Sequence, residues 1–403
     1  MLGYIKAKTV EYAETLSWVD QELQRFDLGP ARHAPLLGRL RGVVKDARIN
    51  LARLEAIVRI FECAKTESGR WGLVKRAVVI IHDLEFSMAI LSYHYLPALQ
   101  KEDAPELALR GLVLSTAKRC GLKWIDDLVV RLDGGHAIFP YLPETPVLSA
   151  PPQQATSFID MPGVYHELGH DVFQKFPVIA EALHQEAVDY FNEFRRNVGP
   201  MMPDKRAERD RQIDRALAYW HSMRLNETFS DIFGTFVCGP AYYALCVDLA
   251  MKMNNDLFGV DHEDEHPPIG ARVYACHGTL SESQKRRRAL RSIQRVWKTY
   301  SHEQSRSAEY ELICAGPLLD RLIERSVASI RQCLPDVKQF NNDSPETPIK
   351  RNISPDDSLE TILNLAIGVL HSDSEYYTAW EREAFGTYLL LFSDNSMSGE
   401  YTE

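Results

Sequence analysis

The sequence YHELGH at residues 165–170 decides how the rest of this chain is interpreted. Residues 160–175 around it are predicted to form a helix, and a helix places His166 and His170 on one face, one turn apart. Two such imidazoles can hold Zn²⁺, and Glu167 between them lies beside the coordination position that a water occupies. The pattern therefore predicts a zinc site in which Glu167 is the general base.

A two-histidine zinc site needs one more protein ligand, and the stretch NETFSDIFGTFV at residues 226–237 offers it. Glu227 is the candidate for this third ligand. Asp231, one helical turn later, is placed to accept the outer N–H of a zinc-bound histidine, which fixes the ring and raises its basicity. We therefore expect His166, His170 and Glu227 to bind Zn²⁺, with Asp231 behind them.

The two stretches together resemble the gluzincin group of zinc metallopeptidases. Residues 226–237 are similar to the third-ligand helix of thermolysin-like enzymes, including Asn226 before the glutamate. The resemblance implies a zincin-like core, with Glu167 as general base of a peptide hydrolase. It covers only these two helices, and the segment 171–226 between the ligands is far longer than in thermolysin.

A third stretch, HPPIGAR at residues 266–272, is similar to the His-Pro-Pro-x-x-x-Arg segment of the HtpX-like and CAAX-prenyl endoprotease families. The resemblance implies that His266 or Arg272 approaches the site, where His266 would stabilise the oxyanion of a tetrahedral intermediate. An equal alternative is a proline-shaped loop in which Arg272 makes a structural ion pair. Four tyrosines are further candidates for the oxyanion donor: Tyr165, Tyr242, Tyr243 and Tyr274.

The two-histidine pattern occurs a second time, as HEDEH at residues 262–266. Gly259 precedes it and Pro267-Pro268 follows it, and its unbroken run of charged and polar residues leaves no apolar face for a buried helix. We interpret this copy as a loop and not as a second metal site.

Composition limits the class of protein. With 403 residues, 45% of them hydrophobic and 25% charged, the chain is long enough for more than one domain of ordinary globular composition. A net charge of −10 disfavours non-specific nucleic-acid binding. Seven scattered cysteines without a CxxC pair indicate reduced thiols. No signal peptide and no transmembrane run is evident, so a cytoplasmic location is expected.

The predicted elements favour an α+β, predominantly α-helical fold. The expected regions are a helical N-terminal region at 1–100 whose helices 4–27 and 32–65 form a hairpin, a zincin-like metallopeptidase core at 101–280, and a C-terminal helical region at 281–403 with a linker near 341–355. Further helices are expected over 70–98, 178–198 and 306–333, and Ser281-Glu282-Ser283-Gln284 is a capping-box pattern at the start of another. The expected β-prone runs are 128–132 and 136–142, separated by the turn signal Asp133-Gly134-Gly135, and a third at 146–149.

The function predicted from these features is a zinc-dependent metallopeptidase that acts on a protein substrate, with the helical regions available to a regulatory partner. Two alternatives stay open: a binding or regulatory protein whose metal is structural or absent, and a hydrolase of small peptides or amides. The intact Glu167 argues against a structural metal, which needs no base. A basic run, KRRR at 285–288 with Arg291 and Arg295, is either a contact for nucleic acid or an acidic partner, or a solvated helix face.

Overall fold

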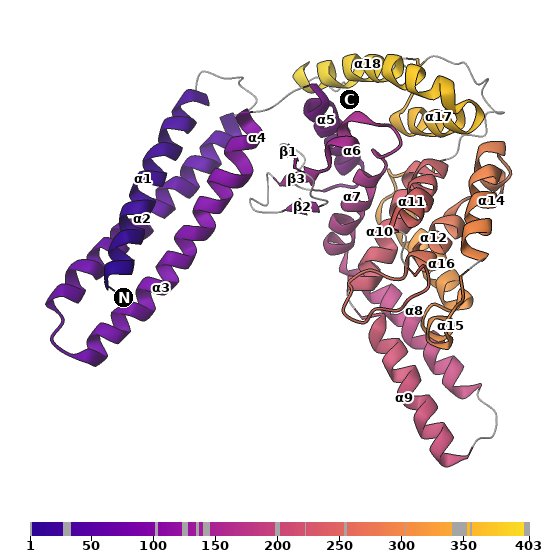
Figure 1. The fold of residues 1–403 in the computed structure, drawn as a ribbon, viewed down its shortest axis with the longest axis horizontal. Coiled ribbons are helices and arrows are strands. Elements are labelled where there is room, and N and C mark those ends of the chain that lie inside the picture. Colours follow the sequence, from indigo (N-terminus) through magenta and orange to yellow (C-terminus); the bar gives the residue numbers. More distant parts are fainter. Residues whose placement is uncertain are drawn as a thin grey trace. The chain divides into compact units, whose positions relative to one another are not determined.

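The architecture is predominantly helical with one small sheet, as the sequence predicts (Figure 1). This computed structural model describes residues 2–26, 34–100, 104–122, 128–133, 137–139, 146–197, 202–221, 223–253, 256–302, 304–340, 353–354 and 357–398. Among these residues no helix is both long and apolar enough to span a lipid bilayer.

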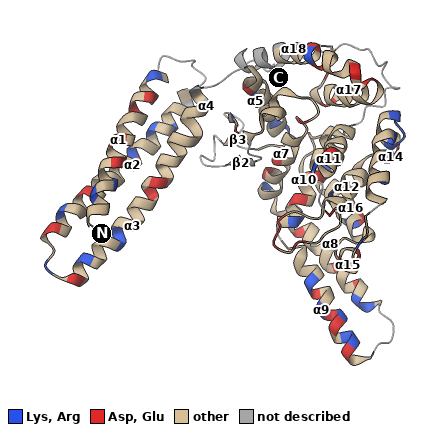
Figure 2. Ribbon diagram, viewed as in Figure 1, with Lys and Arg blue, Asp and Glu red and all other residues tan. Residues whose placement is uncertain are grey.

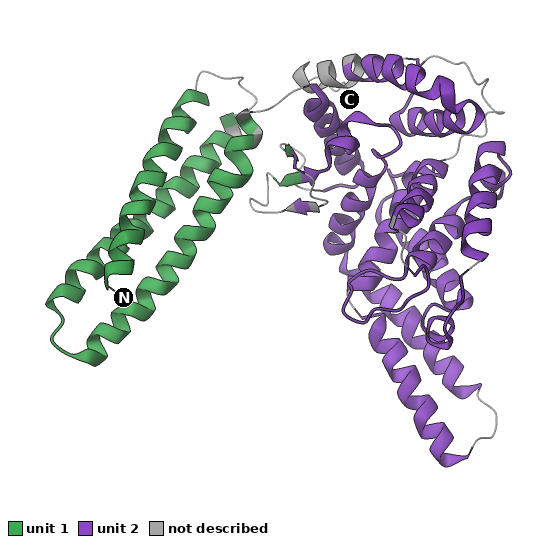
Figure 3. Ribbon diagram, viewed as in Figure 1, with its two compact units in different colours: residues 1–103, 126–131, 139–148 green, residues 104–125, 132–138, 149–403 purple. Residues whose placement is uncertain are grey.

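The chain divides into two compact units (Figure 3). Unit 1 comprises residues 1–103, 126–131 and 139–148, and unit 2 comprises residues 104–125, 132–138 and 149–403. Unit 2 thus contains residues on both sides of position 280, where the sequence suggests a boundary.

The N-terminal part of unit 1 is a bundle of three long helices, α1 (Leu2–Phe26), α2 (Ala34–Cys63) and α3 (Glu67–Ala89). Apolar residues recur every three or four positions along each helix and meet in one core. The predicted two-helix hairpin is therefore only part of this bundle, because α3 packs against both α1 and α2.

The end of α3 shows how one proline changes a helix. The helix continues through a π-helical turn, η2 (Ile90–Tyr95), into α4 (Leu96–Gln100). Pro97 has no N–H for the carbonyl of Tyr93, four residues earlier. That carbonyl instead accepts a hydrogen bond from Arg131 Nη1 at 2.7 Å. The single α-helix predicted over residues 70–98 therefore changes its winding before the proline.

Three short strands, β1 (Val129–Leu132), β2 (Ala137–Phe139) and β3 (Val147–Ala150), form a sheet in the order β1-β3-β2. Val129 N donates to Pro146 O at 3.0 Å and Asp133 N donates to Ala150 O at 3.2 Å, so β1 and β3 run parallel. Although a turn signal separates the first two β-prone runs in the sequence, β1 and β2 are not neighbours, because β3 lies between them. The predicted turn at 134–135 lies outside the described residues.

Unit 2 carries the remaining helices. They are α5 (Ala104–Arg119), α6 (Pro152–Thr156), α7 (Gly163–Lys175), α8 (Pro177–Arg196), α9 (Pro203–Tyr219), α10 (Met223–Cys238), α11 (Pro240–Met253), α12 (Ile269–Thr279), α13 (Glu282–Lys285), α14 (Arg288–His302), α15 (Ala308–Ile313), α16 (Gly316–Cys333), α17 (Leu359–Ser372) and α18 (Ser374–Ser398). Helix α10 is the central element, packed against α7, α12 and α16 and buried from Leu225 to Cys238.

Several boundaries differ from the sequence expectations for local reasons. The helix predicted over residues 306–333 is two helices, since α15 ends at Ile313 and Pro317 occupies the first turn of α16. The predicted capping box at Ser281 is confirmed, but it starts only the four residues of α13. Helix α11 is not predicted, and most of the linker expected near 341–355 lies outside the described residues.

Candidate metal centre

Helices α7 and α10 approach each other closely, and this contact builds the site. Gly169 of α7 faces Ser230 of α10, where an added Cβ would lie 2.7 Å from the Ser230 Cα. Only glycine permits this approach. Leu168 and Val172, on either side of this contact along α7, are buried and anchor the helix in the core. The histidines of α7 therefore face the first turns of α10.

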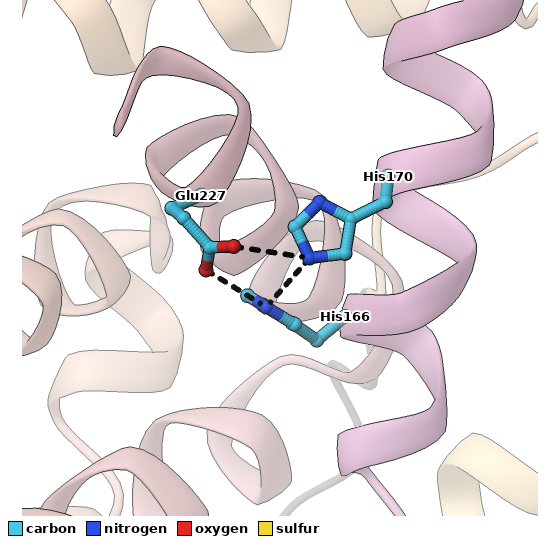
Figure 4. Close-up of side chains that lie close together, drawn as sticks. All are labelled: His166, His170 and Glu227. Atoms are coloured by element: carbon cyan, nitrogen blue, oxygen red, sulfur yellow. Dashed lines mark hydrogen bonds and ion pairs between the residues drawn. The ribbon is translucent and has the colours of Figure 1, made fainter. Parts of the chain in front are cut away.

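Three side chains from these helices converge in one group (Figure 4). His166 Nε2 and His170 Nε2 lie 3.1 Å apart. Glu227 Oε2 lies 3.2 Å from His166 Nε2, and Glu227 Oε1 lies 3.3 Å from His170 Nε2. A tetrahedral metal with bonds of about 2.0–2.1 Å requires ligand atoms about 3.3–3.4 Å apart. The distances between the two imidazole nitrogens, and from each nitrogen to one of the two Glu227 oxygens, are close to this spacing, so the group fits one divalent metal ion.

The burial of Glu227 supports the same conclusion. Its side chain is 7% exposed, and its Oε2 atom accepts no hydrogen bond of good geometry from the described residues. An unsatisfied buried carboxylate oxygen is costly unless a cation or a donor meets it. Two imidazole nitrogens and one carboxylate are a donor set that suits zinc and several other transition metals. The residues present therefore fit a metal ion, whose identity the geometry alone does not fix.

The outer nitrogens of both histidines contact oriented partners. Ser230 Oγ lies 3.0 Å from His170 Nδ1. Tyr242 Oη lies 3.0 Å from His166 Nδ1, and Asp231 Oδ1 lies 3.1 Å from the same atom. Such partners fix the ring orientation and leave Nε2 for the metal. Asp231 therefore lies where the sequence predicts, and the other two contacts are additional.

Asp231 is held in turn by Arg272. Arg272 Nε donates to Asp231 Oδ2 at 2.7 Å and Arg272 Nη2 donates to Asp231 Oδ1 at 2.8 Å. Burial by itself raises the pKa of Asp231, but Arg272 outweighs it and holds this pKa well below its usual value. Of the two roles open to Arg272, the structure supports the ion pair, which fixes the carboxylate beneath His166.

The carboxylates of Asp231 and Glu227 make the surroundings of His166 favourable for positive charge. Burial lowers the pKa of His166, but hydrogen bonding to Asp231 and Glu227 more than offsets it and raises this pKa to about 10. Groups that stabilise an imidazolium also stabilise a metal cation at the same position. The electrostatics of the group thus agree with its geometry.

Glu167 shares the first turn of α7 with His166 and is buried. Burial raises its pKa, and the neighbouring His166 lowers it. No residue in the described ranges makes a hydrogen bond to its carboxylate. A carboxylate with a raised pKa and free oxygens suits proton transfer near neutral pH.

His266 approaches the group from the loop between α11 and α12. Its Nε2 lies 3.5 Å from Glu227 Oε2, and its side chain is 49% exposed. Its Nδ1 lies 2.9 Å from Asp264 Oδ1. His266 is not among the three residues whose ligand atoms all lie within 4.8 Å of one another. It therefore borders the group on a solvent-accessible side and does not complete it.

Arg224, in the first turn of α10, fastens this loop. Its Nη2 atom donates to the carbonyls of Asp261 and His262, at 3.2 and 2.7 Å, and to that of Asp264. Its guanidinium also stacks 4.1 Å from the ring centroid of Tyr219. The helix that supplies Glu227 thus also positions the loop that supplies His266.

The tyrosines considered from sequence do not lie where an oxyanion would form. Tyr165 Oη donates to Glu360 at 3.1 Å, and Tyr274 Oη donates to Asp320 at 2.9 Å. Tyr243 is buried against His277. Tyr242 Oη donates to Asp231 at 2.7 Å, behind His166. The four tyrosines are therefore packing or orienting residues.

A second buried group, Asp231 with Cys246 and Cys276, does not suit a cation. Both oxygens of Asp231 already accept hydrogen bonds from Arg272. Burial raises the pKa of Cys276 well above its usual value, so its thiol stays protonated and donates to Cys246 Sγ at 3.4 Å. We interpret this pair as core packing.

Sequence reasoning missed Ser230 and Arg224, and it considered Tyr242 only as an oxyanion donor and not as a partner of His166. Ser230 adjoins Asp231 in the stretch compared above, and Gly169 opposite it was a signal of close helix contact. No spacing rule links Tyr242 to His166 or Arg224 to a loop almost forty residues away, because both contacts are tertiary. No protein-family model, curated protein or solved structure matches this chain.

Proposed function

We propose that this protein is a zinc-dependent metallopeptidase of the gluzincin type that hydrolyses peptide bonds in a protein substrate. The observation that carries the proposal is the convergence of His166, His170 and Glu227 on one point, with Glu167 one residue from the first ligand. The substrate class rests on the resemblance of both site helices to those of gluzincin peptidases.

An incomplete ligand set favours catalysis over a structural metal. Structural zinc sites are closed by four protein ligands, whereas catalytic ones keep a position open for water. Among the described residues the group holds three ligands, and His266 lies beside Glu227 without joining the set. A bound zinc ion would supply the acidity of its water and the polarisation of the substrate carbonyl.

The chain's own residues have separable tasks in this proposal. Glu167 takes the proton of the attacking water and passes it to the leaving amine. His266 donates a hydrogen bond to the oxyanion of the tetrahedral intermediate. Asp231, Ser230 and Tyr242 keep both imidazoles turned so that Nε2 faces the third ligand.

The deciding experiment compares wild type with Glu167→Gln, which keeps the shape and removes the base. Metal content is measured by mass spectrometry of the purified proteins, and cleavage is measured on an unfolded protein mixture by terminal peptide labelling. We expect about one zinc per chain in both proteins and a loss of cleavage of about 10²–10⁴-fold in the variant. Glu263→Gln, in the other HExxH pattern, is the matched control and should cleave as wild type does.

The outcomes separate the proposal from its alternatives. Equal cleavage by wild type and Glu167→Gln would refute Glu167 as the base. Zinc without cleavage of any protein, but with Glu167-dependent hydrolysis of dipeptides, would favour a small-substrate hydrolase. Zinc with no hydrolysis of either would favour a binding protein.

A further test concerns the oxyanion donor. His266→Ala should lower turnover by about 10²–10³-fold while leaving zinc content unchanged. His262→Ala is the control, since His262 contacts Glu309 at 2.9 Å and lies away from the ligands. A loss of zinc in His266→Ala would instead make His266 a fourth ligand.

A further inference from the structure

A second feature of unit 2, unconnected with the metal ligands, is a cavity of about 560 Å³. It lies between the first turns of α14 and helix α17, with Pro240 at the start of α11. Small-molecule sites are commonly cavities of about 300–1,000 Å³ with an apolar lining and a few convergent polar groups. The size of this cavity is therefore that of a ligand site.

Among the described residues, four arginines line one side of the cavity, and no acidic residue of these ranges lines it. They are Arg287, Arg288, Arg291 and Arg295. Figure 2 shows basic positions, in blue, on α14. Arg291 and Arg295 form no ion pair with any residue in the described ranges and are exposed. At Arg291 and Arg295 the cavity wall thus carries positive charge that pairs with no carboxylate of the described residues.

The arrangement of these arginines is unfavourable for the helix itself. Arg287, Arg291 and Arg295 follow one another at four-residue spacing, and like charges at this spacing repel. Arg288 and Arg291 also lie in the first turns of α14, where the helix dipole disfavours positive charge. A solvated helix face does not require this pattern. An anion held between the guanidinium groups would offset both costs.

The opposite wall supplies apolar surface and hydroxyl groups. Leu365, Ile367 and Val369 of α17 contribute the apolar part, and Thr361 contributes a hydroxyl group. Gly368 also lines this wall, and a Cβ added there meets nothing within 4 Å. The space in front of α17 is therefore open to the body of a ligand.

We propose that this cavity binds a small organic phosphate, with its phosphate groups on the arginines of α14 and its apolar or aromatic body against α17. Guanidinium groups bind phosphate oxygens bidentately, and several together suit a molecule with more than one negative charge. The mixed lining favours an organic phosphate over a free inorganic ion. This site is separate from the metal ligands, and none of its lining residues belongs to the metal centre.

The cavity also borders the helices that build the metal centre. Asn364 lines it and donates to the carbonyl of Cys238, the last residue of α10, at 2.7 Å. Its Oδ1 accepts from Ala241 N at 3.2 Å. A ligand in the cavity would thus lie beside the junction between α10 and α11.

The test uses isothermal titration calorimetry on the full chain with AMP, ADP and flavin mononucleotide as probes, and with pyrophosphate and citrate for comparison. At least one organic phosphate should bind with one site per chain and a dissociation constant below about 1 mM. It should bind at least about tenfold more tightly than pyrophosphate or citrate, since neither of these has an apolar body.

Two pairs of variants locate the binding. Arg291→Glu with Arg295→Glu should weaken binding by at least about 100-fold, whereas Arg286→Glu with Lys298→Glu, the same charge change outside the cavity, should have less than about threefold effect. Gly368→Leu should fill the space and abolish binding without altering charge. Gly368→Ala should fold and bind nearly as wild type does, because its methyl group has room.

Clear results would overturn the proposal. It fails if none of the three organic phosphates binds below about 1 mM. It also fails if citrate binds as tightly as they do, or if Gly368→Leu leaves binding unchanged, since the arginines would then be a general anion surface. Circular dichroism of each variant excludes unfolding as the cause of lost binding.

Discussion

The chain carries the pattern His-Glu-x-x-His twice, and the two copies have opposite structures. In the copy at 166–170 the residues lie on α7, and both imidazoles face Glu227. In the copy at 262–266 the residues form bends, and His262 and His266 contact Glu309 and Asp264 respectively. The same residue types therefore form a candidate ligand pair in one place and loop contacts in the other.

The difference lies in the carboxylates that meet the imidazoles. Asp231 is fully buried beneath His166, and Arg272 fixes both of its oxygens. Asp264 is half exposed and forms part of the same short loop as its histidine. A pattern becomes a site when tertiary structure supplies buried, oriented partners from another helix. Four predictions follow this contrast from the largest effect to the smallest.

The largest difference is expected in zinc affinity, between substitutions of a histidine in the first copy and of one in the second. His166→Ala should lower zinc affinity by on the order of 10²–10³-fold, because a binding free energy of about 10–16 kcal/mol shared by three protein ligands and a water gives about 2.5–4 kcal/mol for each. His262→Ala should leave zinc affinity unchanged. Competition with a chromogenic chelator measures both. Equal losses in the two variants would show that the copy at 262–266 also binds the metal.

The next largest difference is expected between the carboxylates that contact the histidines, Asp231 in the first copy and Asp264 in the second. Asp231→Asn should lower zinc affinity by about 10–100-fold and destabilise the fold by about 3–5 kcal/mol, since it leaves Arg272 buried without its charge partner. Asp264→Asn removes an exposed contact and should cost less than about 1 kcal/mol. Chelator competition and urea unfolding give the two values. A stable Asp231→Asn protein with full zinc affinity would contradict the role given to this carboxylate.

Helix spacing gives the third contrast. Gly169→Ala should destabilise the protein by about 1–3 kcal/mol, because its methyl group would meet the Ser230 backbone at 2.7 Å. Gly259→Ala, in the loop before the second copy, meets only the Asp256 side chain and should change stability by less than about 0.5 kcal/mol. Thermal unfolding compares them. A neutral Gly169→Ala would mean that α7 and α10 can separate without cost.

The loop anchor should show the smallest effect. Arg224→Lys keeps the charge but loses the guanidinium that donates to three loop carbonyls. The free energy that holds the loop in place should therefore fall by about 1 kcal/mol. Turnover should fall roughly three- to tenfold through His266, with zinc content unchanged. Arg211→Lys, an exposed residue of α9 paired with Glu208, is the control. Loss of zinc in Arg224→Lys would place the anchor in the metal site itself.

The sequence predicts some parts of this structure well because those parts depend on local pattern. Helical spacing of apolar residues locates α1, α2 and α8, and the approach of Glu227 and Asp231 to the histidines agrees with the expectation from the two motifs. Helix α11 was missed because residues 240–253 are apolar on most sides and show no single face.

Other parts could not be predicted because they depend on contacts between distant residues. The strand order of the sheet depends on pairing that local turn signals do not encode. Likewise, only the folded chain shows that Arg272 forms an ion pair with Asp231 and that Tyr242 lies behind His166. The sequence predicts the basic run at 285–288 as a solvated helix face or as a contact for nucleic acid or an acidic partner. The cavity beside this run is formed only when α17 packs against α14.

The contact between Tyr165 and Glu360 has a consequence for how the protein is made. Tyr165, directly before the first ligand, donates to a carboxylate 195 residues later, which also accepts from Arg119 at 2.8 Å. At a synthesis rate of about 5–20 residues per second, a ribosome needs about 10–40 seconds to add that stretch. The histidines therefore emerge from the ribosome well before α17 can secure the helix that carries them. Stable metal loading is expected to follow the completion of translation.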